Sequence, residues 1–88
     1  MTTSGDMTAR ELAQIFEPGV QITQVREVIA SADITYYGWT SHRDPNPADA
    51  EWFIVKKYVS GSQDIYARVD GTDGQESVWN DYSSLTYE

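Results

Sequence analysis

The residues of this chain that spell a known catalytic sequence are His42, Arg43 and Asp44, the core of a protein-kinase catalytic loop. That loop requires an asparagine five positions after its aspartate, where this chain has Asp49, and 88 residues are too few for the kinase fold. His42 is the only histidine and there is no cysteine, so one chain cannot assemble the familiar zinc-binding sets. We therefore predict a protein that is not an enzyme and that has no catalytic, metal or cofactor site.

A second candidate for chemistry is the segment Asp70–Gly74, in which aspartates alternate with glycines. Oxygen ligands spaced around a glycine also occur at the start of calcium-binding loops. The spacing of an EF-hand is not met here, and Asp-Gly pairs are typical of tight hairpin turns. We predict a turn at this segment and keep calcium binding as the alternative.

The charge of the chain argues against several classes of partner. Six Lys and Arg stand against fourteen Asp and Glu, which gives a net charge of −8. No basic stripe exists that would neutralise nucleic-acid phosphates or bind an anionic membrane, so we predict no direct binding to nucleic acid or membrane. The acidity serves solubility, meets a basic partner or imitates DNA.

Aromatic residues are the other conspicuous feature, because eleven of the 88 residues are Trp, Tyr or Phe. A domain of this size removes only roughly 60 to 65% of its unfolded surface from water, so we expect some aromatic surface to face another chain. Trp39, Trp52 and Trp79 have two alternative roles. They form the hydrophobic centre of a small sheet, or they stack on sugar rings in a carbohydrate-binding module.

Residues 1–19 are predicted to form a flexible N-terminal arm that carries a short helix. Thr8 and Glu11 stand at the spacing of a capping box, and Pro18-Gly19 ends the helical pattern. Three large apolar residues recur at helical spacing: Leu12, Ile15 and Phe16. This apolar stripe must dock, either on the chain's own sheet or on a neighbouring subunit.

Residues 20–88 are predicted to form a single antiparallel β domain, because short β-branched and aromatic segments alternate with turn residues. In residues 20–31 a strand is favoured, and a helix remains the alternative. The strongest strand pattern, at residues 51–59, is apolar on both faces in its first half and therefore predicts a central strand. Gly38 is expected to mark a bulge or bend in the strand at residues 34–40.

Two closing strands are predicted at residues 77–82 and 84–88. The fold class is therefore mainly β, a small antiparallel β-sandwich or barrel-like meander with one short N-terminal α-helix. No apolar run approaches the ~20 residues that cross a bilayer, and residues 1–6 lack the basic start and apolar stretch of a signal peptide. We expect a soluble protein that is not exported.

The stretch from Ile34 to Tyr87 resembles small virion structural proteins of tailed bacteriophages. The residues that carry the resemblance are, in order, Thr35-Tyr36-Tyr37-Gly38, the loop residues Pro45 and Ala48, Glu51-Trp52-Phe53-Ile54-Val55-Lys56-Lys57, Tyr66-Ala67 before Asp70-Gly71, and Val78-Trp79-Asn80-Asp81-Tyr82-Ser83-Ser84-Leu85-Thr86-Tyr87. They form a pattern of structural residues and contain no catalytic motif.

The resemblance implies a non-enzymatic structural component located in the virion, assembled in the host cytoplasm, in the neck, tail or fibre attachment, or on the capsid as a decoration protein. Its partners would be other virion proteins and further copies of itself in a symmetric homo-oligomer. The candidate interface residues are Leu12, Ile15 and Phe16 on the arm, and Trp39, Trp52, Trp79 and Tyr82 on the sheet. An acidic DNA-mimic inhibitor of a nucleic-acid-binding host protein and a small carbohydrate-binding receptor module are the alternatives.

Overall fold

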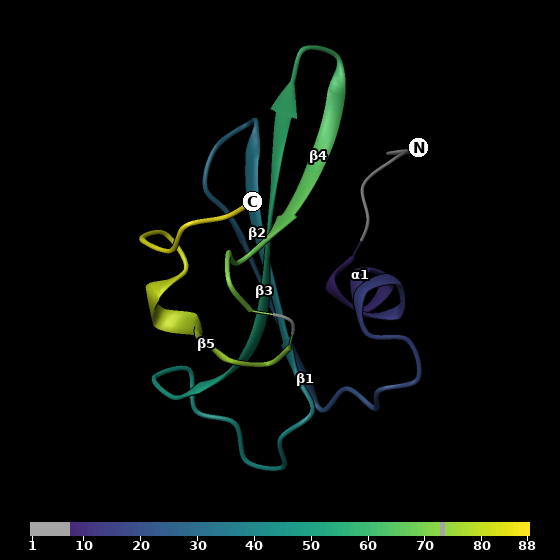
Figure 1. Cartoon of the computed structure of the whole chain (residues 1–88), viewed down its shortest axis with the longest axis vertical. Coiled ribbons are helices and arrows are strands. Elements are labelled where there is room, and N and C mark those ends of the chain that lie inside the picture. Colours follow the sequence, from purple (N-terminus) through teal and green to yellow (C-terminus); the bar gives the residue numbers. More distant parts are fainter. Residues whose placement is uncertain (1–7, 73) are drawn as a thin grey trace.

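A computed structural model of the chain describes residues 8–72 and 74–88 (Figure 1). The first seven residues of the predicted flexible arm lie outside the described residues. The elements in chain order are the helix α1 (Ala9–Phe16), the strands β1 (Gln24–Ile29), β2 (Ile34–Thr40), β3 (Ala50–Ser60), β4 (Gln63–Arg68) and β5 (Ser77–Val78), and a 3-10 turn, η1 (Trp79–Asp81). The prediction of a mainly β protein with one short N-terminal helix is confirmed.

Helix α1 begins at the predicted capping box. The backbone N–H of Glu11 donates to Thr8 Oγ1 (3.2 Å), and the backbone N–H of Thr8 donates to Glu11 Oε1 (2.8 Å). Two amides that a helix start leaves without partners are thereby satisfied. After the helix, Gly19 has a φ of +85°, a conformation that favours glycine and turns the chain towards β1.

The strands form one antiparallel sheet in the order β1-β2-β3-β4, and β5 pairs with the start of β3. The strand favoured for residues 20–31 is therefore confirmed at Gln24–Ile29, since β1 pairs with β2 along its whole length. β3 is the central strand, as its pattern predicted, because it pairs with β2, β4 and β5. Residues 52–55 are all buried, and alternate side chains enter cores on opposite faces.

The two faces of the sheet are covered by different segments, and Figure 1 shows α1 on one side and the chain from β5 to the C-terminus on the other. The helix-side core contains Ala9, Leu12, Ala13, Tyr37, Trp39, Phe53 and Val55. Within it, the rings of Trp39 and Phe53 are stacked with centroids 4.8 Å apart. The predicted arm is therefore corrected for its described part, because α1 is one wall of the domain's own core.

The C-terminal-side core contains Tyr36, Trp52, Ile54, Val69 and Trp79. Gly38 lies under this core, and a Cβ at that position would be 2.5 Å from Cε3 and Cζ3 of Trp79. The expected bulge at Gly38 is wrong, since Gly38 pairs in regular register with Arg26 and Ile54. Because glycine has no side chain, the indole ring of Trp79 can pack directly against the backbone at Gly38.

The end of the chain departs from the prediction of two closing strands. Only Ser77–Val78 is a strand, and residues 79–81 form the 3-10 turn η1. Further on, Tyr87 makes an isolated antiparallel bridge to Val69, and the backbone N–H of Glu88 donates to the carbonyl of Arg68 (3.0 Å). The turn bends the chain so that Trp79 and Tyr82 both face the sheet, with ring centroids 5.1 Å apart.

Candidate functional site

Most of the residues predicted to form an interface lie in the interior of the domain. Trp39 and Trp52 are 0% exposed, Trp79 is 4% exposed and Leu12 is 1% exposed. Two of the indole N–H groups are satisfied inside the chain, because Trp39 Nε1 donates to Glu17 Oε1 (2.9 Å) and Trp52 Nε1 donates to the carbonyl of Asn46 (3.1 Å). The expectation that these four side chains face a neighbour is corrected: a sheet covered on both faces has room for all three indoles.

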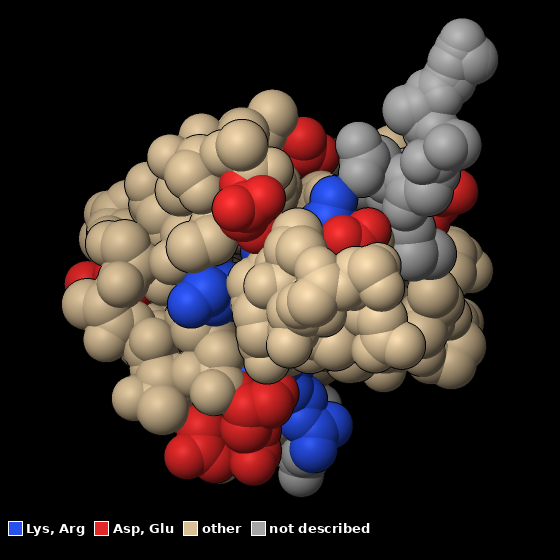
Figure 2. Space-filling model, turned by 90° about the horizontal axis from the view of Figure 1, so that it is seen from above, with Lys and Arg blue, Asp and Glu red and all other residues tan. Residues whose placement is uncertain are grey.

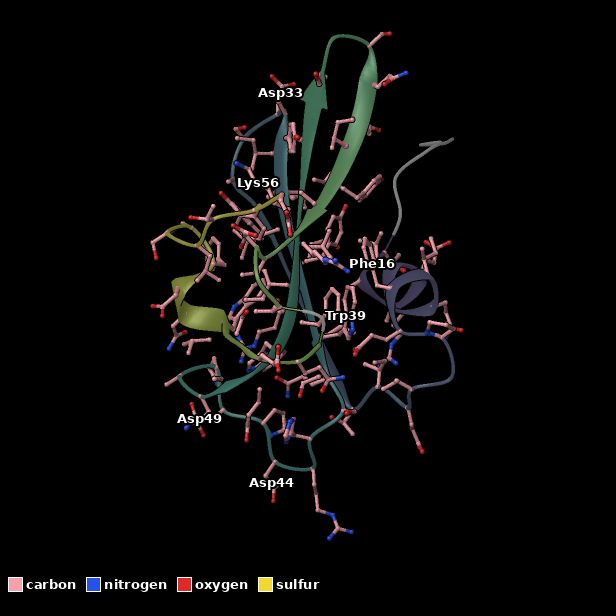
Figure 3. The ribbon with its side chains drawn as sticks, in the orientation of Figure 1. Phe16, Asp33, Trp39, Asp44, Asp49 and Lys56 are labelled. Atoms are coloured by element: carbon pink, nitrogen blue, oxygen red, sulfur yellow. The ribbon has the colours of Figure 1, made fainter. Side chains whose placement is uncertain are left out.

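The other three predicted interface residues lie nearer the surface. Phe16 is half-buried against the helix-side core, with its ring centroid 5.6 Å from that of Phe53, and Figure 3 shows it beside Trp39. Tyr82 is half-buried against the C-terminal-side core. Ile15 is 59% exposed on the outer side of α1 and is therefore the one large apolar residue of the helix available to a partner.

These positions bear on the alternative functions. Indoles that are at most 4% exposed present no face on which a sugar ring could stack, so the observation that suggested a carbohydrate-binding module is explained by the core. On the face shown in Figure 2, the acidic side chains lie in separate groups with lysine or arginine side chains among them. An elongated acidic stripe, which DNA mimicry requires, is not present on that face.

A pocket of about 460 Å³ lies between the end of the chain and the part of the sheet next to the β1–β2 turn. It is lined by Asp33, Ile34, Lys56, Tyr58, Val59, Leu85 and Tyr87, and we call it the Lys56 pocket. Its volume falls in the range of pockets that hold small ligands or a few residues of a peptide. Its wall combines aliphatic and aromatic side chains with polar groups, and Lys56 and Asp33 bring one charge of each sign.

Lys56 is held in this pocket by aromatic rings. Its Nζ lies 5.6 Å from the ring centroid of Tyr58 and 6.0 Å from that of Tyr87, both within the range of a cation–π interaction. Within the described residues, no carboxylate forms an ion pair with this ammonium group. Asp33 is an exposed residue directly before β2, and Figure 3 shows it nearer the end of the sheet than Lys56.

Tyr87 forms the wall of the pocket on the side of the chain's end. Its hydroxyl donates a hydrogen bond to the carbonyl of Tyr82 (2.6 Å), and its ring centroid lies 5.8 Å from that of Tyr36. Burial, and secondarily the neighbouring Tyr36, raises the pKa of Tyr87 well above its ordinary value. Tyr87 therefore remains a neutral hydrogen-bond donor throughout the physiological pH range.

Sequence reasoning missed the Lys56 pocket. Two of its walls, β3 and the chain's end, are about thirty residues apart, and only the register of the fold brings them together. A local signal was nevertheless present in Lys56, which follows four buried residues and lies on the same face of β3 as Trp52 and Ile54. When the neighbours of a lysine on the same face are apolar, its ammonium group is expected to have a specific partner.

The motifs singled out for chemistry form no site in the part of the chain that is described. His42 Nδ1 lies 3.7 Å from Glu51 Oε1 near the surface, and no group of three or more metal-ligating side chains is found among the described residues. At the Asp70–Gly74 segment, Thr72 Oγ1 donates to the carbonyl of Val69 (3.2 Å) and Gly71 has a φ of +84°, which are features of a turn. Asp73 lies outside the described residues, so calcium binding there stays a hypothesis.

None of the helices described is long and apolar enough to span a bilayer. No protein-family model, curated protein or solved structure matches the chain.

Proposed function

We propose that the protein is a non-enzymatic structural component of a tailed-phage virion that binds neighbouring virion subunits, itself included, in the neck, tail or fibre attachment or as a capsid decoration. The observation that carries the proposal is the Lys56 pocket, an open site with both polar and apolar walls and with a lysine that has no ion-pair partner within the described chain. Such a site suits a protein segment with an apolar and an acidic side chain.

The rest of the domain supports a binding role. Its aromatic residues are used to build two cores on one sheet, which makes a scaffold of only 88 residues rigid enough to present a preformed site. Large apolar side chains remain at the surface at Ile15, Ile29 and Val59. Ile29 and Val59 lie at the end of the sheet that holds the pocket, so the binding surface is assigned to these two residues and to the pocket, in place of the tryptophans.

The proposal is tested by quantitative mass spectrometry of purified particles of the phage whose genome encodes the chain. Copies of this chain are counted relative to the major capsid protein. Hundreds of copies support capsid decoration, and six, twelve or a few dozen support a position in the neck, tail or fibres. Absence from the particle overturns the proposal, and salt-dependent competition with DNA for a host protein then tests the acidic inhibitor.

A matched pair of variants locates the contact within the particle. A photo-crosslinking residue in place of Leu85, at the edge of the Lys56 pocket, should form adducts with a virion subunit in assembled particles. The same residue in place of Arg43, an exposed position in the loop between β2 and β3, serves as the control. Equal adducts at both positions would contradict the assignment of the pocket as the binding surface.

A further inference from the structure

Beyond α1, part of the helix-side face of the sheet is not covered by any described segment of the chain. Val25 packs on the helix-side core, and alternation along β1 places Glu27 and Ile29 on the same face. Ile29 is 71% exposed, and Glu27 is exposed as well. We call these two residues the Ile29 patch: one acidic and one large apolar side chain, about 7 Å apart along the strand.

The Lys56 pocket, on the opposite face, offers what the Ile29 patch lacks. Along β3, Lys56 and Tyr58 are also two residues apart on one face, so a cation and an apolar wall repeat the spacing of the acid and the isoleucine. Opposite charges and apolar side chains are therefore set at matching intervals on the two faces. This complementarity is the form expected of two surfaces that bind each other.

The register of the sheet shows that the two sites also lie at similar positions along the strands and run in the same direction. Glu27 pairs with Tyr37, one residue from the row in which Tyr36 pairs with Lys56. In the same way, Ile29 pairs with Thr35, one residue from the row of Ile34 and Tyr58. β1 and β3 run in the same direction because each is antiparallel to β2. The direction from Glu27 to Ile29 is therefore the same as the direction from Lys56 to Tyr58.

From this register we infer that copies of the chain bind head to tail, with Glu27 and Ile29 of one copy in the Lys56 pocket of the next. Glu27 supplies the carboxylate that Lys56 lacks among the described residues, and Ile29 packs against Tyr58 and the aliphatic wall. The inference rests on the proposed function, since it names a second copy as one of the subunits that the domain binds.

A head-to-tail contact uses two different surfaces and generates a ring or an open filament. In Figure 1 the molecule is narrower towards the β3–β4 hairpin than at the level of α1 and η1. The Ile29 patch and the Lys56 pocket both lie towards the narrow end, near the turn that joins β1 to β2. Copies that meet there are tilted towards one another, and a constant tilt in one direction closes a ring.

The first test is the association of the full chain between micromolar and millimolar concentrations, measured by sedimentation velocity and native mass spectrometry. We expect a closed assembly of defined copy number. Ile29→Asp should raise the dissociation constant at least about tenfold, because it removes the buried apolar group and adds a second acid. Ile15→Asp, a change of the same kind at a 59% exposed position on α1, is the matched control and should associate as the unaltered chain does.

The second test uses charge reversal. Glu27→Lys and Lys56→Glu should each weaken association about tenfold, because like charges then meet in the contact. An equimolar mixture of the two variants should associate fully, since every contact again joins a lysine to a glutamate. Circular dichroism and thermal melting of each variant show whether it is folded before its association is measured.

The third test separates head-to-tail binding from a symmetric contact. Ile29→Asp keeps an intact pocket, and Lys56→Glu keeps an intact patch, so their mixture should form a dimer with one copy of each and nothing larger. A chain that stays monomeric at all concentrations overturns the inference, as does association that Ile29→Asp leaves unchanged or a mixture that assembles beyond the dimer. The particle count proposed above does not depend on these results. A failure of the head-to-tail inference therefore does not decide whether the protein is part of a virion.

Discussion

The two faces of the sheet are closed in contrasting ways. On the helix side, eight residues of regular helix with a complete capping box lay a continuous apolar stripe over Tyr37, Trp39 and Phe53. On the other side, the cover is an irregular segment that contains a two-residue strand, one 3-10 turn and an isolated bridge. The Lys56 pocket is on this second side.

The contrast places the candidate site on the side of the sheet whose cover is less regular. A regular helix packs closely on a sheet because its side chains recur at a fixed spacing. An irregular segment follows no such spacing, and the hollow it leaves is lined by Lys56, Tyr58 and Tyr87. One face is therefore a closed hydrophobic core and the other carries the candidate site, as is usual for function on loops supported by a rigid scaffold.

The largest effect is expected from a cavity in the helix-side core. Leu12→Ala should lower the free energy of unfolding by about 3 kcal/mol, because Leu12 is 1% exposed and the rigid surroundings do not fill the space. Leu85→Ala, at a half-buried position beside the pocket, should lower it by about 1 kcal/mol. Urea denaturation followed by tryptophan fluorescence measures both, and equal losses would contradict the division between the two faces.

The next largest effect concerns the close approach of Gly38 and Trp79. Gly38→Ala should destabilise the fold by about 2 kcal/mol, because the added Cβ would lie 2.5 Å from two ring carbons of Trp79 and force the indole to move. Gly74→Ala is the control, since its Cβ would meet only Glu17 Oε2, at 4.0 Å. The comparison is made by thermal denaturation, and a neutral Gly38→Ala would show that the C-terminal-side core is loosely packed.

A smaller effect is expected at the start of α1. Thr8→Ala removes the side chain that caps the helix and should cost about 1 kcal/mol. The control is Thr86→Ala on the other face, an exposed threonine whose backbone carbonyl accepts a hydrogen bond from Asp70. Both variants are compared by denaturant titration. If they lowered the free energy of unfolding by equally small amounts, the capping box would contribute little to the stability of the helix-side core.

The smallest effect is a dependence on pH on the pocket side. The pKa of Tyr87 is raised in the folded protein by burial and then by Tyr36, so the unfolded chain loses this proton first as the pH rises. The resulting stabilisation is complete below about pH 10, the ordinary pKa of tyrosine, and declines above it. In thermal melts from neutral to alkaline pH, Tyr87→Phe should therefore show a shallower alkaline fall than the unaltered chain. It should also be slightly less stable at neutral pH, because it lacks the hydrogen bond to Tyr82.

Local patterns predicted the parts of the fold that depend on local physics. Spacing and residue type predicted the capping box at Thr8 and Glu11, a strand within residues 20–31 and the central position of β3. The burial of the three tryptophans was underestimated because covering the sheet on both faces requires the end of the chain, whose path has no periodicity. The Lys56 pocket and the role of Gly38 depend on that same path and could not be predicted locally.

The burial of β3 on both faces has a consequence for the newly made chain. Trp52-Phe53-Ile54-Val55 is an uncharged, strand-forming segment that is exposed until β2, β4 and both covering segments have assembled around it. Segments of this kind pair with one another and aggregate unless charged residues flank them. Lys56 and Lys57 directly follow this segment, so their charges oppose aggregation of the unfolded chain. This effect does not depend on the place of Lys56 in the folded pocket.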